Sequence, residues 1–365
     1  MIFARRGMLD KVMVSTVMLI ALCSILFAYS ATLDRGDEGG DLSSLVMRQG
    51  IWIFVGFVFL FLIANSNYLK VLNFAYLLYA LNLAALLFLL FFGGERYGAR
   101  RWIAVGPVSL QPSEFVKITV ILALAAFVGE RREKMRSLKT YLGAILIVMP
   151  AAALIFLQPD LGTALVLAPI LFSILFICGA KIRYMLLTAA GVVASMPVFW
   201  GLLKDYQKSR LMVFINPNID PLGAGYTIIQ SKIAIGSGGL FGKGWLNGTQ
   251  SYLKFLPERH TDFIFSVIGE EWGFLGAIFL ISLFAILIAR GIRVIDAADN
   301  IYGRAIATGV ITLIAFQMFV NISMTIGIMP VVGLPLPMIS YGGSNTIATL
   351  IGIGFLLSIG RQARR

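Results

Sequence analysis

The chain has 365 residues, of which 59% are hydrophobic and only 13% are charged, and its mean hydropathy is +0.88. This composition excludes a water-soluble domain, in which about a quarter of the residues are charged. The formal net charge of +12 does not indicate a nucleic-acid partner, because the basic residues are spread over many loops and no soluble domain gathers them into a patch.

Apolar windows of about 17 to 25 residues, the length at which a helix crosses a bilayer, recur ten times along the chain. Only helices satisfy their backbone groups within such runs, so we expect an all-α, polytopic membrane protein in which 1–365 form a single domain. The expected spans are 13–32, 48–66, 69–92, 113–129, 141–158, 161–180, 183–203, 263–289, 305–328 and 340–360.

The first span has two interpretations. Arg5, Arg6 and Lys11 precede an apolar run that ends at 27–31, a pattern shared with cleavable signal peptides. An uncleaved helix instead places both termini on one side of the membrane. Because most Lys and Arg near the span ends then fall on that side, with a dense cluster at 131–139, we expect both termini to be cytoplasmic.

Positive charge also occurs on the outer side, in the loop between the third and fourth spans, which carries Arg96, Arg100 and Arg101. This placement opposes the orientation signal and predicts an anionic ligand outside the membrane; a solvated basic loop is the alternative. Arg48 begins the second expected span. It either anchors the helix at the interface or binds a lipid phosphate.

Charged residues also occur within or beside apolar helices. Glu114 and Lys117 are three residues apart, so they share a helix face and are expected to form an ion pair inside the bundle, as a structural staple, a substrate-binding pair, or both. Asp160 either caps the sixth span or faces an external cavity. Glu270 and Glu271, in the eighth span, must face protein or water, which favours a structural or gating role.

The longest non-spanning segment is 204–261, on the outer side between the seventh and eighth spans. Its apolar residues and glycines predict ordered structure, with an amphipathic or re-entrant helix over 226–235. The Gly-rich run 236–245 is not a phosphate loop, because Gly244 follows Lys243 where a Ser or Thr is required.

Asp262 directly follows this segment, at the start of an apolar helix. A carboxylate there loses part of its hydration, which indicates binding or catalysis, although it would also suit an N-cap. His260 either orients this base, binds substrate, or is a structural residue. The Pro- and Gly-rich stretch 327–337 predicts a broken helix lining a cavity, to which Asn321, Ser344 and Asn345 contribute hydrogen bonds.

One candidate base among many cations suits glycosyl transfer from a lipid-linked pyrophosphate. The pyrophosphate is a good leaving group, so a base for the acceptor hydroxyl suffices, unlike the carboxylate pair of glycosidases. Basic groups or a divalent cation, Mg²⁺ or Mn²⁺, would stabilise the departing charge; no other cofactor and no protein metal-ligand set are predicted. The candidate substrate-binding residues are Arg48, Arg101, Glu114, Lys117, Asp160, Arg210, Lys232, Lys243 and His260.

Over essentially its whole length, the sequence resembles the SEDS family (shape, elongation, division and sporulation). Arg259, together with the Gly-Lys-Gly-Trp run, is more similar to the elongation branch than to the division branch of this family. The most specific stretches are 220–226, 230–240, 242–245, 248–250 and 255–265.

The resemblance implies a peptidoglycan glycosyltransferase for cell elongation in the bacterial cytoplasmic (inner) membrane, with a periplasmic active site. Asp262 would match the family's essential aspartate, which activates the acceptor sugar of lipid II. The donor would be a glycan on undecaprenyl pyrophosphate, the product a β-1,4 link, and the partner a class B penicillin-binding transpeptidase. A lipid II flippase, which predicts alternating access, a division-type polymerase and a synthase scaffold stay open as alternatives.

Overall fold

The computed structural model describes residues 9–32, 42–93, 101–105, 108–202, 205–221, 223–253 and 255–363. Within them, eight helices are long and apolar enough to cross a membrane, and two shorter apolar stretches, 161–177 and 182–197, correspond to the other two expected spans. The spans are α1 (Lys11–Thr32), α2 (Leu42–Asn65), α4 (Ala75–Phe92), α5 (Pro112–Glu130), α6 (Leu138–Leu157), α7 (Leu161–Ile177), α8 (Ile182–Leu202), α12 (Ile264–Ala297), α13 (Ile301–Thr325) and α14 (Gly343–Gln362). The polytopic helical fold is therefore confirmed.

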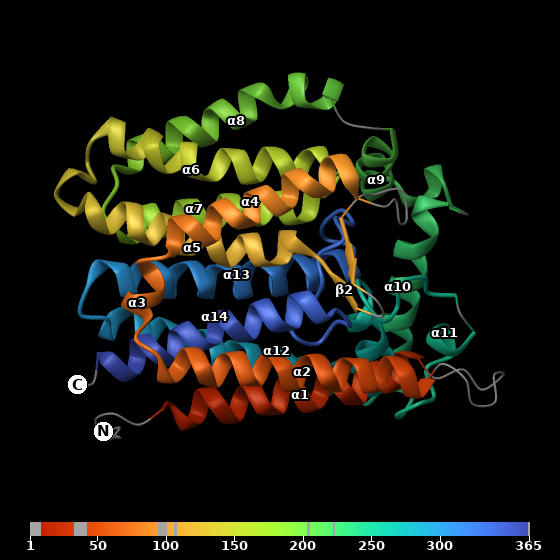
Figure 1. Cartoon of the computed structure of the whole chain (residues 1–365). Helices are drawn as coiled ribbons and strands as arrows, with labels where there is room; N and C mark the ends of the chain where they lie inside the picture. Colours follow the sequence, from red (N-terminus) through yellow and green to blue (C-terminus); the bar gives the residue numbers. More distant parts are fainter. Residues whose placement is uncertain are drawn as a thin grey trace.

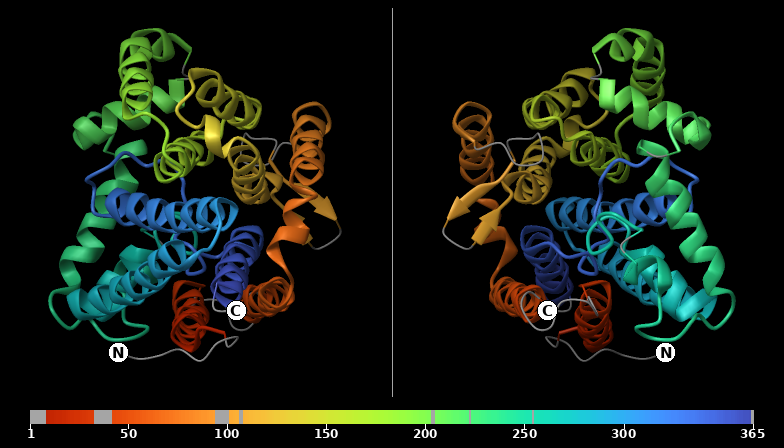
Figure 2. Two further views of the ribbon diagram at one scale, coloured as in Figure 1. Left: turned by 90° about the vertical axis from the view of Figure 1, so that its left-hand side faces the viewer. Right: turned by 90° about the vertical axis from the view of Figure 1, so that its right-hand side faces the viewer.

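The spans run side by side, as Figures 1 and 2 show, and α5 lies in the middle of the bundle in contact with α4, α6, α7, α13 and α14. Its central position explains why almost all of its side chains are buried, whereas α2 and α4 expose Phe54 and Phe92 on their outer faces. Exposed Phe and Leu on helices of this length are suited to contact with lipid.

The structure differs from the expectation in several places. The third span is divided, because a short helix, α3 (Tyr68–Leu72), precedes α4. α2 begins at Leu42, so Arg48 lies inside a helix and not at its start. The fold is not all-α locally: β1 (Ile103–Val105) and β2 (Val108–Leu110) form an antiparallel hairpin before α5. Two strands of three residues are too short to give a detectable alternation in the sequence.

Several short elements gather at one end of the bundle, opposite the first turn of α1 and the last turn of α14 (Figure 1). α10 (Ala224–Gly238) runs across this end and packs on α12. Its buried residues Ile228, Ser231 and Ala234 are spaced by three and so lie on one helix face. The helix predicted over 226–235 is thus confirmed. The other short elements at this end are α9 (Asp205–Ile215), the 3-10 turn η2 (Pro217–Ile219) and α11 (Thr249–Tyr252). A further 3-10 turn, η1 (Arg132–Lys134), follows α5.

α12 is interrupted at Gly273, whose φ of 63° and ψ of −158° are not helical. The loop that follows α10 pairs with the backbone groups on both sides of this interruption, so they are not left unsatisfied. Four backbone bonds form this joint: Lys243 N to Glu270 O (3.0 Å), Gly244 N to Glu271 O (3.0 Å), Phe274 N to Gly239 O (2.9 Å) and Leu275 N to Leu240 O (3.1 Å).

Candidate active site

Asp262 lies in a turn of residues 257–263, which we call the Asp262 turn, directly before α12. The N-cap position of α12 is occupied by Phe263, and no side chain caps this helix. The Asp262 carboxylate therefore does not serve as a helix cap, and the structure favours the other interpretation of this residue, a carboxylate that binds or reacts.

Three consecutive carbonyl groups of the Asp262 turn accept hydrogen bonds from the α13–α14 region. Tyr341 N donates to His260 O at 2.8 Å, Ser340 Oγ donates to Thr261 O at 2.5 Å, and Asn321 Nδ2 donates to Asp262 O at 2.9 Å. The backbone of the turn is thereby fixed relative to the neighbouring helices.

Between α13 and α14, residues 326–342 form no regular element, which confirms the predicted helix break. Asn321 also donates to Leu334 O at 2.8 Å, inside this 326–342 segment. At Gly333, with φ at +72°, an added Cβ would lie 3.4 Å from Asp262 Oδ2. The main chain of the segment thus flanks the carboxylate, and glycine supplies the positive φ that this path requires.

Burial raises the pKa of the Asp262 carboxyl to about 6, and the negative charge of Glu258 adds to this rise. The positive charge of Arg210 opposes it. More weakly, Asp160 also raises this pKa and Arg101 lowers it. At neutral pH the group is ionised, and it is more basic than an ordinary aspartate. These are the properties of a general base.

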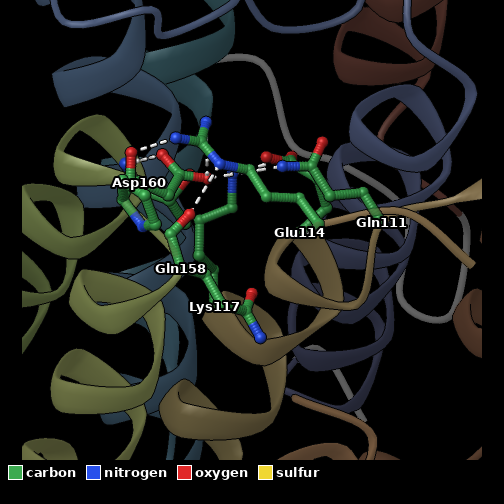
Figure 3. Close-up of polar contacts among 8 residues, drawn as sticks. Gln111, Glu114, Lys117, Gln158 and Asp160 are labelled. Carbon is green, nitrogen blue, oxygen red and sulfur yellow. Dashed lines mark hydrogen bonds and ion pairs between the residues drawn. The ribbon is translucent and has the colours of Figure 1, made fainter. Parts of the chain in front are cut away.

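Arg101 binds the turn before α7. Its Nε donates to Gln158 O at 2.9 Å and its Nη2 to Pro159 O, and its Nη1 lies 3.7 Å from Asp160 Oδ2. Asp160 Oδ1 accepts from Thr163 N at 3.1 Å, which confirms it as the cap of α7. Figure 3 shows Asp160 and Gln158 opposite Gln111 and Glu114, and Gln111 Nε2 lies 3.4 Å from Asp160 Oδ2.

The expected ion pair of Glu114 and Lys117 is confirmed, with Lys117 Nζ 2.7 Å from Glu114 Oε2 and both side chains buried. Asn345 Nδ2 donates to the same carboxylate oxygen at 2.7 Å, and Ser344 Oγ accepts from Gln111 N at 2.9 Å. Buried charges need such partners, so α5 and α14 are joined here by polar contacts.

Arg210 and Lys232 lie near the 326–342 segment. Arg210 Nη1 donates to Val331 O at 3.3 Å, and the exposed Lys232 passes over Gly327 so closely that an added Cβ there would meet Lys232 Cε at 2.0 Å. The His260 ring meets Tyr341 edge-on at 6.0 Å between centroids. Burial lowers the pKa of His260, which favours the neutral imidazole.

Two candidates lie elsewhere. Lys243 Nζ contacts Glu270 Oε1 at 2.7 Å and Thr249 Oγ1 at 2.8 Å, beside the interruption of α12. Arg48 is exposed on α2. Arg96 and Arg100 are outside the described residues, so the predicted basic loop is represented by Arg101 alone.

Sequence reasoning missed Gln111, Ser340 and Glu258 as parts of this region. Ser340 carried no signal, because its role depends on a contact with Thr261, far away in the chain. Glu258 precedes Asp262 by four residues and acts on its pKa, which the local clustering of two carboxylates indicates in retrospect.

The fold is that of a polytopic membrane protein. At one end of its helix bundle lies a carboxylate whose pKa is raised and on which two arginines act electrostatically. This arrangement is a candidate site for acid-base chemistry on an anionic substrate. The family model FTSW_RODA_SPOVE, described as cell cycle protein, matches residues 10–365, and the chain belongs to this family.

Relatives of known name match nearly the whole chain. Peptidoglycan glycosyltransferase MrdB of Escherichia coli (strain K12) is 43% identical over 352 residues, covering 96% of this chain and 94% of that protein. Peptidoglycan glycosyltransferase RodA of Treponema pallidum (strain Nichols) is 34% identical over 423 residues, covering 96% and 97%.

Solved structures match as well. A chain from a structure described as "Structural coordination of polymerization and crosslinking by a peptidoglycan synthase complex" superposes with a TM-score of 0.82 at 34% identity, covering 97% of this chain and 98% of that one. The crystal structure of the rod shape determining protein RodA of Thermus thermophilus gives a TM-score of 0.73 at 31% identity, with 98% of each chain covered.

Proposed function

We propose that Asp262 is the general base with which this chain, a peptidoglycan glycosyltransferase like its MrdB and RodA relatives, polymerises lipid II into β-1,4 glycan strands for cell elongation. The observation that carries this assignment is the raised pKa of a carboxylate whose backbone is fixed at three successive carbonyls. A fixed base of this strength is suited to taking a proton from a sugar hydroxyl at neutral pH.

In the proposed reaction, the Asp262 carboxylate accepts the proton of the acceptor hydroxyl of lipid II. The hydroxyl oxygen attacks the anomeric carbon of the growing glycan from the face opposite the pyrophosphate. The bond from that carbon to the pyrophosphate oxygen breaks, its electron pair leaves with undecaprenyl pyrophosphate, and the configuration inverts to β. A second carboxylic acid is not required, because this leaving group needs no protonation.

Arg210 and Lys232 are the proposed partners of the departing pyrophosphate, because both are exposed beside the 326–342 segment and Arg210 acts electrostatically on Asp262. We assign Arg101 a structural role instead, because its guanidinium donates hydrogen bonds to the carbonyl groups of Gln158 and Pro159.

A divalent cation, Mg²⁺ or Mn²⁺, belongs to the proposal as a ligand shared with the substrate. The described residues hold no group of three His, Cys, Asp or Glu side chains that could bind a metal ion, so we propose no cage formed by these residues alone. Mg²⁺ is commonly bound by one or two carboxylates together with substrate phosphates, so the pyrophosphate of the substrate would supply part of its ligands. The cation would neutralise charge on the pyrophosphate.

The protein is a membrane protein; we place it in the bacterial inner membrane with both termini cytoplasmic and Asp262 periplasmic. The basic residues near the spans support this orientation. The proposed partner is a class B penicillin-binding transpeptidase, because a similar chain occurs in a complex described as coordinating polymerization and crosslinking.

The test is polymerisation of labelled lipid II by the purified protein with its partner. Asp262→Asn is expected to lower the rate by about 100-fold or more, the usual contribution of a general base, while Asp296→Asn, at the exposed other end of α12, leaves it unchanged. An active Asp262→Asn enzyme would refute the assignment. If the same variant moved lipid II across vesicles, the flippase function would be favoured.

A further inference from the structure

The Asp262 turn is not part of α12, so the regular helix hydrogen bonds do not fix the position of its carboxylate. Within the turn, Thr261 N and Phe263 N both bond to Glu258 O, which closes it locally without orienting it against the bundle. Its orientation therefore depends on the bonds that reach it from α13 and the 326–342 segment.

Asn321 supplies one of these bonds from the interior of α13. Its side chain is fully buried, and its single amide nitrogen donates to both Asp262 O at 2.9 Å and Leu334 O at 2.8 Å. Both hydrogens of the amide are thus committed. The residue joins the Asp262 turn to the same segment whose Gly333 flanks the carboxylate.

Ser340 supplies a second bond, and its direction is defined. Its Oγ accepts from Leu336 N at 2.8 Å and lies 2.5 Å from Thr261 O. A carbonyl oxygen can only accept, so the hydroxyl hydrogen points to Thr261. Asn321 and Ser340 therefore fix two adjacent peptide units, those whose carbonyl groups belong to Thr261 and Asp262.

We propose that Asn321 and Ser340 are positioning residues of the glycosyl transfer, which hold the Asp262 carboxylate in line with the acceptor hydroxyl and in its water-poor environment. This inference rests on the proposed function of Asp262. Neither side chain needs to touch substrate: each acts through the backbone of the base. A displacement of a catalytic group by about 1 Å can cost about 100-fold in rate, so two fixed peptide bonds beside the base have a measurable consequence.

The experiment compares Asn321→Leu, which keeps the size but removes both donated bonds, with Gln317→Leu. Gln317 is one turn earlier in α13, equally buried, and its Nε2 has no hydrogen-bond partner among the described residues, so it is a matched control. Lipid II polymerisation is measured per folded molecule, with kcat, KM and the pH dependence of kcat determined for each. Ser340→Ala, a smaller change, is measured in parallel in case Asn321→Leu does not fold.

A positioning role predicts that kcat falls by about 10- to 100-fold in Asn321→Leu while KM changes little. It further predicts a change in the pH dependence of kcat. The increase of kcat with pH, which follows the ionisation of Asp262, moves to a pH below 6, because a loosened turn admits water to the carboxylate and lowers its pKa. Ser340→Ala shows the same two changes more weakly, and Gln317→Leu shows neither.

The inference is overturned if folded Asn321→Leu and Ser340→Ala keep the kcat and pH profile of the parent, or if Gln317→Leu loses as much activity as they do. These outcomes are separate from failure of the proposed function, which would appear as an active Asp262→Asn enzyme.

Discussion

Lys243 and Glu270 form an ion pair with 2.7 Å between Nζ and Oε1, and the Glu270 side chain is completely buried. The same carboxylate oxygen accepts from Thr249 Oγ1 and Gln250 N, each at 3.0 Å. Lys243 thereby fixes the loop after α10 against α12, which is a structural task different from the substrate contact expected of it.

Lys243→Met is expected to destabilise the protein by about 3 kcal/mol, because the buried negative charge of Glu270 then loses its positively charged partner. Thermal unfolding in detergent checks this, with the exposed Lys70→Met as control. A variant of normal stability that fails to bind lipid II would instead return Lys243 to the substrate site.

Asp262 is expected to reduce stability at neutral pH. The folded protein raises the pKa of this carboxyl from 3.8 to about 6, so the fold favours the protonated carboxylic acid. The protein is therefore more stable below pH 4, where the group is protonated, and loses stability as the pH rises through 6. Asp262→Asn should therefore raise stability by about 1 to 3 kcal/mol at pH 7.5 and have little effect at pH 4. Unfolding measured at both pH values would contradict this if the gain were equal.

Glu258 is expected to adjust the basicity of Asp262, because its negative charge raises the pKa of that carboxyl. Glu258→Gln should move the rising limb of the activity profile to lower pH, since Asp262 then ionises more readily. The measurement is kcat for lipid II polymerisation between pH 5 and pH 8, pH values chosen to bracket the pKa of about 6. A limb that stays in place would show that Glu258 has no such effect.

Single and double variants of Glu114 and Lys117 distinguish a structural ion pair from a substrate-binding one. Lys117→Met should cost about 3 to 5 kcal/mol, and the double variant Lys117→Met with Glu114→Leu should recover much of that loss, because no buried charge is then left alone. If the double variant is stable but inactive, the pair binds substrate; if it is stable and active, the pair is a staple. Unfolding and polymerisation are measured on the same preparations.

Gly242 is required by close packing. An added Cβ would lie 2.1 Å from Glu271 O, and φ is +79°, so Gly242→Ala must disrupt the backbone joint with α12. Gly236 on α10 has open space, which makes Gly236→Ala a control. Lower stability and activity in the first variant alone are expected, and equal behaviour of the two would contradict the joint.

Much of the fold could be predicted from the sequence because each span is long and apolar throughout. The ion pair in α5 and the cap at Asp160 followed from spacing within one helix or turn. What could not be predicted depends on contacts between distant segments: the bond from Ser340 to Thr261, the three-residue strands, and the pairing of Lys243 with Glu270, since the sequence alone does not show which loop returns to which helix.

The interruption at Gly273 separates the piece of α12 that follows the Asp262 turn from the rest of that helix. Two backbone bonds from the loop after α10, to Glu270 O and Glu271 O, and the contact of Ser231 Oγ with Ser266 Oγ at 2.6 Å join this piece to α10 and its loop. The first piece of α12, directly after Asp262, is thus attached to a helix that crosses the end of the bundle (Figure 1). A displacement of α10 would therefore act on the base through the first turns of α12 alone, because the interruption at Gly273 separates these turns from the rest of the helix.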